Sequence, residues 1–255
     1  MTKKIISLFL STGSYNSFVE RILEVAKKQQ SSYVCIANAH MTIEAYWDIR
    51  FAEIVNKSDL VTPDGMPLAI AMRLLYSIKQ ERVAGMDLLP TLLKKAEEEN
   101  LGVFFYGGTD EMLQKTQNFV QATYPNLKEQ AYYSPPFRAL TAEEEDSVIQ
   151  RINDSRAHLV FVALGCPKQE KWMAGMKGKI NACMLGIGGA LPVMIGMQKR
   201  APQWMQKLSL EWVFRLYQEP KRLFKRYLIT NSLFIILLIK DLININIFKK
   251  NNLKN

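Results

Sequence analysis

Short apolar segments alternate with longer amphipathic segments over most of this chain of 255 residues. The apolar segments are predicted strands and cover Lys4–Leu10, Tyr33–Asn38, Leu60–Thr62, Gly102–Tyr106, Glu129–Tyr133, Leu159–Leu164 and Ala182–Ile187. The segments between them are predicted helices and include Tyr15–Gln30, Met41–Lys57, Pro67–Ser77, Asp87–Asn100, Asp110–Tyr124 and Ala142–Asn153. Strands separated by helices favour βαβ units, and continuous apolar strands suit a sheet that is buried on both faces. We therefore expect an α/β fold with a mostly parallel sheet flanked by helices.

Charge divides the chain into two parts. Residues 1–198 hold 21 Lys/Arg and 21 Asp/Glu, whereas residues 199–255 hold 12 Lys/Arg and three acids, so the whole excess of +9 lies in the last part. We therefore expect an α/β core over residues 1–198 and a basic helical appendage over residues 199–255. A concentrated positive charge indicates an anionic partner, either a membrane surface or a nucleic acid.

The appendage mixes its cations with Trp, Tyr and Phe and then becomes strongly apolar. Pro220 is expected to separate two helices that meet near Glu219. The uninterrupted apolar run Leu233–Ile239 has seven residues, and a spanning helix needs about 20. We therefore expect a segment that lies on an anionic bilayer rather than one that crosses it, and no binding of nucleic acid. Packing of the tail on its own core, or on a sister subunit in a homo-oligomer, remains an alternative.

Composition and missing motifs argue against several classes of protein. Three scattered cysteines and two histidines are a poor basis for a disulfide scaffold or a zinc site. The sequence contains neither G-x-G-x-x-G nor G-x-x-x-x-G-K-[ST], which disfavours an NAD enzyme and a P-loop ATPase. It also contains no D-x-D pair, so a bound diphosphate would have to be neutralised by Arg, Lys and helix N-termini.

Polar and glycine residues follow the predicted strands, at the edge where a parallel sheet binds ligands. Gly-rich strand-to-helix turns suit phosphate because their N–H groups face the anion, although each glycine alone is equally explained by a tight turn. Asp64 lies in a Pro-Asp-Gly turn and is either a catalytic carboxylate or an ordinary turn residue. His40 is either a base or a capping residue.

Several motifs, taken in order, resemble one family. The chain reads DGMP at 64–67, RVAGMDLLP at 82–90, GCPKQEKW at 165–172, GIGGA at 186–190, KRAP at 199–202, LEW at 210–212 and EPKR at 219–222. Together they resemble the WecG/TagA/CpsF glycosyltransferases over roughly residues 33–227. The resemblance implies a Rossmann-like core and a basic appendage that touches the inner face of the bacterial plasma membrane and helps to close the site.

The resemblance also implies an activity. It is inverting, metal-independent and cofactor-free transfer of a sugar, of the N-acetylmannosamine type or a hexose, from a UDP-sugar to a polyprenyl-diphosphate-linked sugar. Such enzymes build cell-surface polysaccharides and teichoic acids. The implied roles are catalysis for Asp64, Arg82 and Asn38, with Asp64 as the base. UDP-sugar binding is implied for Gly107, Gly108, Gly165, Pro167, Gln169, Glu170, Gly188 and Gly189, and acceptor-diphosphate binding for Arg215, Arg222 and Arg226.

Two positions depart from the family pattern. A threonine of the family is Ile36 here, and the family's G-G-x-F-D reads Gly188-Gly189-Ala190-Leu191-Pro192 without the acid. Both changes leave the identity of the donor sugar open. Two other classes also remain open, a nucleotide-binding oxidoreductase and a non-catalytic membrane-associated adaptor that binds nucleotide or nucleic acid.

Overall fold

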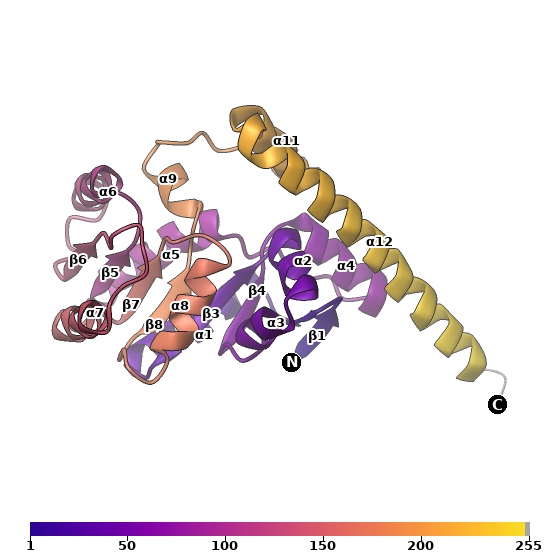
Figure 1. Ribbon diagram of the computed structural model, residues 1–255, viewed down its shortest axis with the longest axis horizontal. Helices are drawn as coiled ribbons and strands as arrows, with labels where there is room; N and C mark the ends of the chain where they lie inside the picture. The colour runs from indigo at the N-terminus through magenta and orange to yellow at the C-terminus, as the bar shows by residue number, and fades with distance from the viewer. Residues whose placement is uncertain (253–255) are drawn as a thin grey trace.

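The centre of the protein is a parallel sheet of six strands in the order β4-β3-β8-β7-β5-β6 (Figure 1). The computed structural model describes residues 1–252, with the side chains of all of them except Lys207 and residues 245–252. The strands of the sheet are β3 (Ser32–Ala37), β4 (Leu60–Pro63), β5 (Val103–Tyr106), β6 (Gln130–Tyr133), β7 (Leu159–Val162) and β8 (Cys183–Gly186). Each is one of the predicted strands, and every neighbouring pair is parallel as expected.

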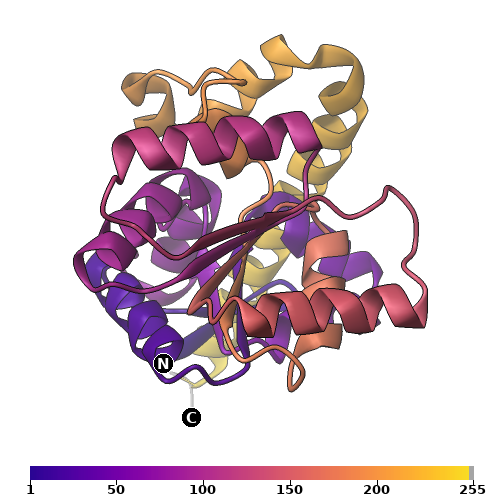
Figure 2. The same ribbon diagram turned by 90° about the vertical axis from the view of Figure 1, so that its left-hand side faces the viewer.

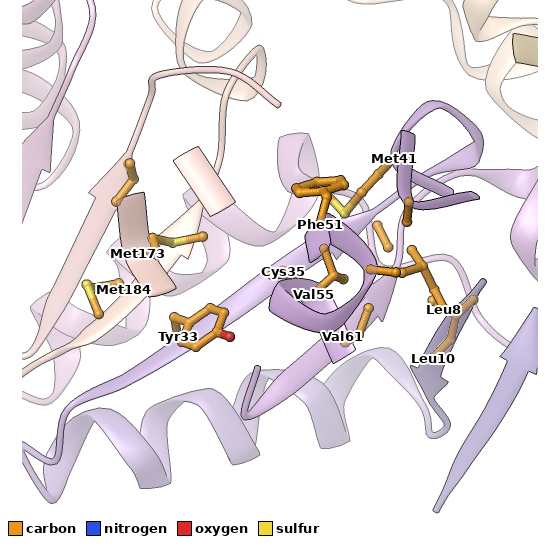
Figure 3. Packing of buried hydrophobic residues seen from close by; sticks show 14 of the residues in the cluster. Leu8, Leu10, Tyr33, Cys35, Met41, Phe51, Val55, Val61, Met173 and Met184 are labelled. Atoms are coloured by element: carbon orange, nitrogen blue, oxygen red, sulfur yellow. The ribbon is translucent and has the colours of Figure 1, made fainter. Parts of the chain in front are cut away.

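Helices cover both faces of the sheet (Figures 1 and 2). The helices of the core are α1 (Tyr15–Lys27), α2 (Ala39–Trp47), α3 (Ile49–Asn56), α4 (Met66–Tyr76), α5 (Gly85–Glu98), α6 (Asp110–Thr123), α7 (Ala142–Asp154), α8 (Lys168–Met176) and α9 (Ala190–Met194). One buried cluster joins the sheet to α2, α3, α4, α7 and α8, and a second joins its other face to α1, α5, α6 and α9. Figure 3 shows the first cluster, in which Phe51 and Val55 of α3 pack near Cys35 of β3.

The strand order places the ends of distant strands side by side. The chain runs from β3 outward to β4, crosses to β5 and β6, and returns through β7 to β8, which inserts between β7 and β3. A sheet whose strand order reverses in this way opens a crevice beyond the carboxyl ends of its central strands. The loops that follow β3, β7 and β8 therefore meet at this crevice.

The prediction of a single strand over Lys4–Leu10 is wrong. The segment forms an antiparallel hairpin of β1 (Thr2–Ile5) and β2 (Leu8–Ser11), which is separate from the parallel sheet. The chain turns at Ile6, whose φ is 57°. The hairpin still buries Ile5, Leu8 and Leu10 in the core, which explains why the apolar pattern alone resembled one strand.

The prediction of one helix over Met41–Lys57 is also wrong. Asp48 has extended backbone angles (φ −120°, ψ 100°), so α2 ends there and α3 begins. The Asp48 carboxylate accepts hydrogen bonds from the backbone N–H groups of Arg50 and Phe51 and thereby caps α3. Helix α8 was not among the predicted helices.

The appendage contains α10 (Gln203–Lys207), α11 (Glu211–Gln218) and α12 (Pro220–Asn252). The predicted break between two helices at Glu219 and Pro220 is confirmed. Helix α12 packs on α2 and α4 (Figure 1). The residues that it buries follow a helical spacing and are Leu223, Tyr227, Thr230, Phe234, Leu237 and Leu238.

Helix α12 also exposes apolar side chains, including Phe224, Leu228, Ile235, Ile236 and Ile239. Among the described residues, the segment Pro220–Asn244 is long and apolar enough to cross a membrane by length and composition, because it contains an 18-residue stretch with a mean hydropathy of 1.5, 28% of which is buried. The packing on α2 and α4 agrees with the alternative that the tail packs on its own core.

We predict that Phe234→Ala lowers the free energy of unfolding by about 3 kcal/mol, because a buried ring is lost and a cavity remains. Phe234 is 3% exposed in the core cluster, whereas Ile236 on the same helix is 61% exposed. Ile236→Ala is the matched control and should change the stability by less than about 1 kcal/mol. Urea denaturation measures both variants. Equally small effects would contradict the docking of α12 on the core.

Candidate active site

Four loops and the appendage surround the crevice at the carboxyl edge of the sheet. Asn38 and Asp64 follow β3 and β4, and the segments 164–169 and 186–190 follow β7 and β8. Helices α11 and α12 supply Arg215, Arg222 and Arg226 from the other side. The structure thus brings together the predicted residues Asn38, Asp64, Gly165, Pro167, Gln169, Gly188, Gly189, Arg215, Arg222 and Arg226 around one crevice.

The crevice consists of two adjoining cavities. The loop cavity, about 390 Å³, is lined by the segments 164–169 and 186–190. The appendage cavity, about 150 Å³, is lined by Arg82, Gln206 and Glu211 among others. The two cavities share the residues Asn38, His40, Asp64, Met86, Arg215, Arg226 and Tyr227. Asp64 therefore faces both cavities.

Backbone contacts fix the position of Asp64. Its N–H donates to the carbonyl of Ala37 at 2.6 Å, which ties the end of β4 to the end of β3. Gly65 follows with a φ of 88°, in the left-handed region that favours glycine, and Pro67 occupies the first turn of α4. The Pro-Asp-Gly sequence therefore makes a sharp turn from strand to helix and leaves the Asp64 carboxyl at the crevice.

The surroundings of Asp64 raise its pKa to about 7. Burial is the largest cause, because a desolvated carboxylate is disfavoured, and the negative charge of Glu211 adds to it. The cations Arg82 and Arg215 and the Asn38 side chain act in the opposite direction. A carboxyl with a pKa near neutrality is suited to accept a proton at physiological pH.

Asn38 and His40 lie at the start of α2. The Asn38 side-chain oxygen accepts from the N–H of Met41 at 3.0 Å, so Asn38 is the N-cap of the helix. The buried Nδ1 of His40 lies 3.7 Å from Glu44 Oε1 and has no hydrogen-bond partner. Burial and then the charge of Arg226 lower the pKa of His40 to about 4. The imidazole is therefore neutral at pH 7 and is a poor general base.

Gln169 lies under the glycines of the loop after β8. Its Oε1 accepts from the N–H of Gly165 at 3.1 Å, and its Nε2 donates to Glu170 Oε1 at 2.7 Å. A Cβ on Gly186 would lie 2.7 Å from Gln169 Nε2, and one on Gly188 would lie 3.2 Å from Oε1. Close approach to this amide thus requires small residues at both positions.

Glu170 is fully buried and does not line the loop cavity. Burial raises the pKa of its carboxyl, and its Oε2 has no hydrogen-bond partner. Its role in binding UDP-sugar stays a prediction. In the structure the Glu170 carboxylate accepts the hydrogen bond from Gln169 Nε2 and thereby orients the Gln169 amide.

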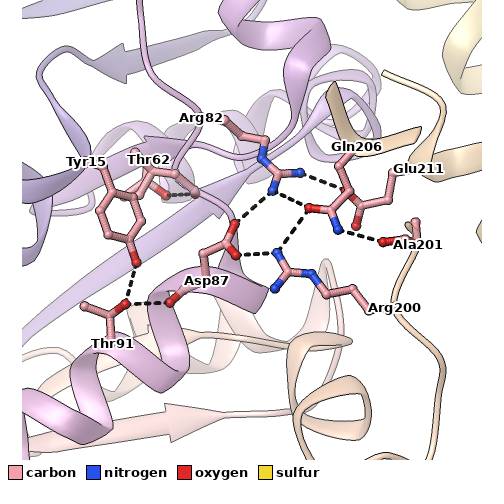
Figure 4. Close-up of polar contacts among 10 residues, drawn as sticks. Tyr15, Thr62, Arg82, Asp87, Thr91, Arg200, Ala201, Gln206 and Glu211 are labelled. Atoms are coloured by element: carbon pink, nitrogen blue, oxygen red, sulfur yellow. Dashed lines mark hydrogen bonds and ion pairs between the residues drawn. The ribbon is translucent and has the colours of Figure 1, made fainter. Parts of the chain in front are cut away.

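Arg82 is the centre of a polar network between the core and the appendage (Figure 4). Its Nη1 donates to Glu211 Oε2 at 2.9 Å, and its Nη2 donates to Asp87 at 2.8 Å and to Gln206 at 3.0 Å. Arg200 also contacts Asp87 and Gln206. The guanidinium of Arg82 thus lines the appendage cavity and is held by partners from α5, α10 and α11.

The three predicted appendage arginines differ in their contacts. Arg215 reaches over the loop after β8, where a Cβ on Gly189 would lie 2.6 Å from its Nη2. Arg222 is exposed and pairs with Glu219. Arg226 lies beside His40 at both cavities, and its Nε is buried without a partner. Unpartnered buried polar atoms on His40 and Arg226 at a cavity wall favour a polar ligand there.

Gly107 and Gly108 lie farther along the edge of the sheet. A Cβ on Gly107 would lie 2.9 Å from the backbone of Ala163, so this glycine allows close packing against the strand end of β7. Gly108 lines a third cavity with Phe137 and Lys168, and Lys168 also lines the loop cavity. Phe137 is 88% exposed. The third cavity therefore extends the loop cavity toward β5 and β6.

Sequence reasoning assigned no role to Glu211, Gln206 or Phe137. Glu211 stands in the Leu210-Glu211-Trp212 motif, which offered a signal, whereas Phe137 lies in a loop without one. Of the two departures from the family pattern, Ile36 lines the loop cavity, whereas Leu191 and Pro192 follow the cavity-lining residues Gly188, Gly189 and Ala190 and do not line it themselves. Among the residues that the structure describes, no three His, Cys, Asp or Glu side chains form a group that could hold a metal ion.

Comparison with known proteins gives a consistent result. The model of the glycosyl transferase WecG/TagA/CpsF family matches residues 3–247. Three similar proteins are each named N-acetylglucosaminyldiphosphoundecaprenol N-acetyl-beta-D-mannosaminyltransferase. One from Bacillus spizizenii is 31% identical over 87% of this chain and 85% of its own. One from Bacillus subtilis is 32% identical over 74% and 72%, and one from Staphylococcus aureus is 29% identical over 80% of each chain.

We predict that Asp64→Asn stabilises the protein increasingly as the pH rises from about 4 to about 7. The unfolded carboxyl loses its proton near its ordinary pKa of 3.8, whereas the folded one holds it to about 7. Wild-type stability therefore falls across this range, and a neutral amide avoids the loss. At pH 8 the free energy of unfolding of the variant should exceed that of the wild type by on the order of 1 kcal/mol or more, because a shift of one pKa unit corresponds to about 1.4 kcal/mol. Urea unfolding at pH 4, 6 and 8 measures the difference, and a pH-independent difference would contradict the raised pKa.

Proposed function

The chain belongs to the WecG/TagA/CpsF family and is a glycosyltransferase, and on this premise we propose its substrates. The donor is a UDP-sugar of the N-acetylmannosamine type or a hexose, and the acceptor is a sugar linked to polyprenyl diphosphate. The names of the related transferases, which specify N-acetylmannosaminyl transfer to N-acetylglucosaminyl-diphosphoundecaprenol, support this choice. The product then enters cell-wall or surface-polysaccharide synthesis.

The observation that carries the proposal is the position of Asp64 at the junction of the two cavities. A base that serves sugar transfer must reach a hydroxyl of the acceptor while the donor lies opposite. We assign the donor to the loop cavity, which is the larger and has backbone turns suited to phosphate. The acceptor sugar is assigned to the appendage cavity. Asp64 lies where the two sugars would meet.

The reaction follows from this placement. Asp64 takes the proton from the acceptor hydroxyl, and the oxygen attacks the anomeric carbon of the donor from the face opposite the diphosphate. The new glycosidic C–O bond forms as the bond to the diphosphate breaks, and UDP leaves. One displacement inverts the anomeric centre. Because its pKa is near 7, the Asp64 carboxyl combines a substantial ionised fraction at physiological pH with enough basicity to accept the proton.

The reaction also requires cations that stabilise the negative charge of the diphosphate groups. We propose that Arg215, Arg222 and Arg226 bind the diphosphates, because Arg forms charge-assisted and bidentate bonds to phosphate oxygens. All three line the loop cavity. These cations provide the stabilisation that a metal supplies in other transferases, so we propose that turnover needs no metal.

The location of the enzyme follows from its lipid-linked acceptor. We propose that the protein is peripheral on the inner, cytoplasmic face of the bacterial plasma membrane. The net charge of +9 in residues 199–255 supports contact with anionic lipids. The exposed apolar side chains of α12 support partial burial in the bilayer surface. Division into a catalytic core of residues 1–198 and an appendage of residues 199–255 is part of this proposal.

A donor panel tests the proposed function. UDP-N-acetylmannosamine, UDP-N-acetylglucosamine and UDP-glucose are each incubated with N-acetylglucosaminyl diphosphate carried on a short polyprenol, with and without EDTA. We expect one donor to be consumed, with unchanged turnover in EDTA. Binding of UDP without turnover of any UDP-sugar would favour a non-catalytic nucleotide-binding adaptor instead.

We predict that Asp64→Asn lowers turnover by about 10²–10⁴-fold, which is the usual contribution of a positioned general base. The affinity for UDP should change little, because the loop cavity is left intact. Initial rates and UDP binding by calorimetry measure the two effects. Turnover within a few fold of the wild type would reject Asp64 as the base.

We predict that Arg226→Gln lowers kcat/KM for the donor or for the acceptor by about 10–100-fold, because a charged hydrogen bond to phosphate is lost. Lys225→Gln is the matched control, since it removes one positive charge from an exposed neighbouring position on the same helix. A short, water-soluble acceptor keeps membrane binding out of the comparison. Equal losses in the two variants would mean that only net charge matters.

A further inference from the structure

Glu211 is a carboxylate of the appendage that lies in the same cavity as Asp64. It belongs to the first turn of α11 and lines the appendage cavity together with Asp64 and Arg82. Its side chain is 22% exposed, and its Oε2 accepts from Arg82 Nη1 at 2.9 Å. An acidic side chain placed beside another carboxyl is unfavourable by itself, so its position calls for an explanation beyond packing.

The groups that face Asp64 come from four parts of the protein. Asn38 and His40 belong to the start of α2, Arg82 to the segment before α5, Glu211 and Arg215 to α11, and Arg226 to α12. His40 is neutral at pH 7. Besides burial, the protonation of Asp64 therefore depends on how strongly the cations Arg82 and Arg215 favour its ionised form and how strongly Glu211 opposes them.

Arg82 is the cation whose effect Glu211 controls. Its guanidinium is engaged by Glu211, Asp87 and Gln206. The bond to Glu211 occupies Nη1 and places a negative charge beside the guanidinium on the side of the appendage cavity. Without this partner, Arg82 would have an unpaired Nη1 in the same cavity as the Asp64 carboxyl. A direct pairing of Arg82 with Asp64 would hold the carboxyl ionised and reduce its ability to take a proton.

We propose that Glu211 is a positioning residue of the transfer reaction, which holds Arg82 away from Asp64 and keeps Asp64 a strong base when α11 lies on the core. This inference rests on the proposed function of Asp64. It also has a physical basis of its own, because the charge of Glu211 raises the pKa of Asp64 whereas the charge of Arg82 lowers it. Replacing Glu211 by a neutral residue removes the rise in the Asp64 pKa that Glu211 causes, and it strengthens the lowering that Arg82 causes.

Three variants separate charge from structure. Glu211→Gln removes the charge and keeps the shape, and Glu211→Asp keeps the charge and shortens the side chain. Asp87→Asn is the matched control, because Asp87 also pairs with Arg82 at 2.8 Å but does not line the appendage cavity. The pH dependence of kcat/KM is measured for the full-length wild type and for each variant, with the donor and acceptor established by the donor panel.

We expect the acidic limb of the Glu211→Gln profile to move to lower pH, with a lower plateau because a weaker base takes the proton less readily. The ratio of variant to wild-type kcat/KM should therefore rise as the pH falls from 8 to 5.5, by about tenfold for each pH unit by which the midpoint moves. Glu211→Asp and Asp87→Asn should keep the wild-type midpoint. A pH-independent loss in Glu211→Gln would overturn the proposal and leave Glu211 with a purely structural role.

A second measurement does not depend on turnover. Carboxyl ¹³C NMR of protein labelled at aspartate follows the titration of Asp64, whose signal is identified by its loss in Asp64→Asn. The midpoint should lie at lower pH in Glu211→Gln than in the wild type. An unchanged midpoint in this titration contradicts the inference about Glu211. A shifted midpoint in a protein that consumes no UDP-sugar contradicts the proposed function and leaves the electrostatic role of Glu211 standing.

Discussion

The guanidinium of Arg82 joins the parts of the protein on which the site depends. It belongs to the segment between α4 and α5, and it binds Asp87 of α5, Gln206 of α10 and Glu211 of α11. The core and the appendage therefore meet through hydrogen-bonded charges that lie beside the cavity wall, where partial burial makes such bonds stronger than at an open surface. Helix α11 in turn brings Arg215 over the loop after β8. This network and the packing of α12 on α2 and α4 together hold the appendage over one side of the crevice.

In the mechanism that we propose, the charges around Asp64 divide the tasks of a sugar transferase among separate residues. The carboxyl is desolvated and close to neutrality in its pKa, and His40 beside it is kept neutral by burial and by Arg226. The cations lie instead on α11 and α12, toward the loops that suit a diphosphate. A base surrounded by unpaired cations would be weak, and a diphosphate without cations would be a poor leaving group. The pairing of Arg82 with Glu211 and Asp87 and the position of Arg226 at the cavity wall agree with both requirements of the proposed mechanism.

Helix α12 runs from the crevice and carries an exposed apolar surface. One face buries Tyr227 and Phe234 against the core, and another exposes apolar residues such as Ile235 and Ile239. The same helix carries Arg222 and Arg226 at its start, beside the loop cavity. A helix with these two faces suits an enzyme whose lipid-linked acceptor remains in the bilayer while its sugar is modified at the crevice. Docking on the core then fixes the distance between the arginines and the base.

The six parallel strands, most of their helices, the break before Pro220 and the group of residues at the carboxyl edge of the sheet could all be predicted from the order of residues. Local pattern suffices for these features, because strand periodicity, turn residues and motif order are properties of neighbouring residues. Four features were visible only in the folded protein: the first apolar segment is a hairpin, Asp48 divides a helix, Glu170 lies behind Gln169, and Glu211 shares a cavity with Asp64 and pairs with Arg82. The hairpin and the break at Asp48 are local, but their apolar patterns equally fit one strand and one helix, whereas the pairing of Arg82 with Glu211 joins residues 129 positions apart. Burial and charge at Asp64 are set by such contacts, and no local pattern specifies them.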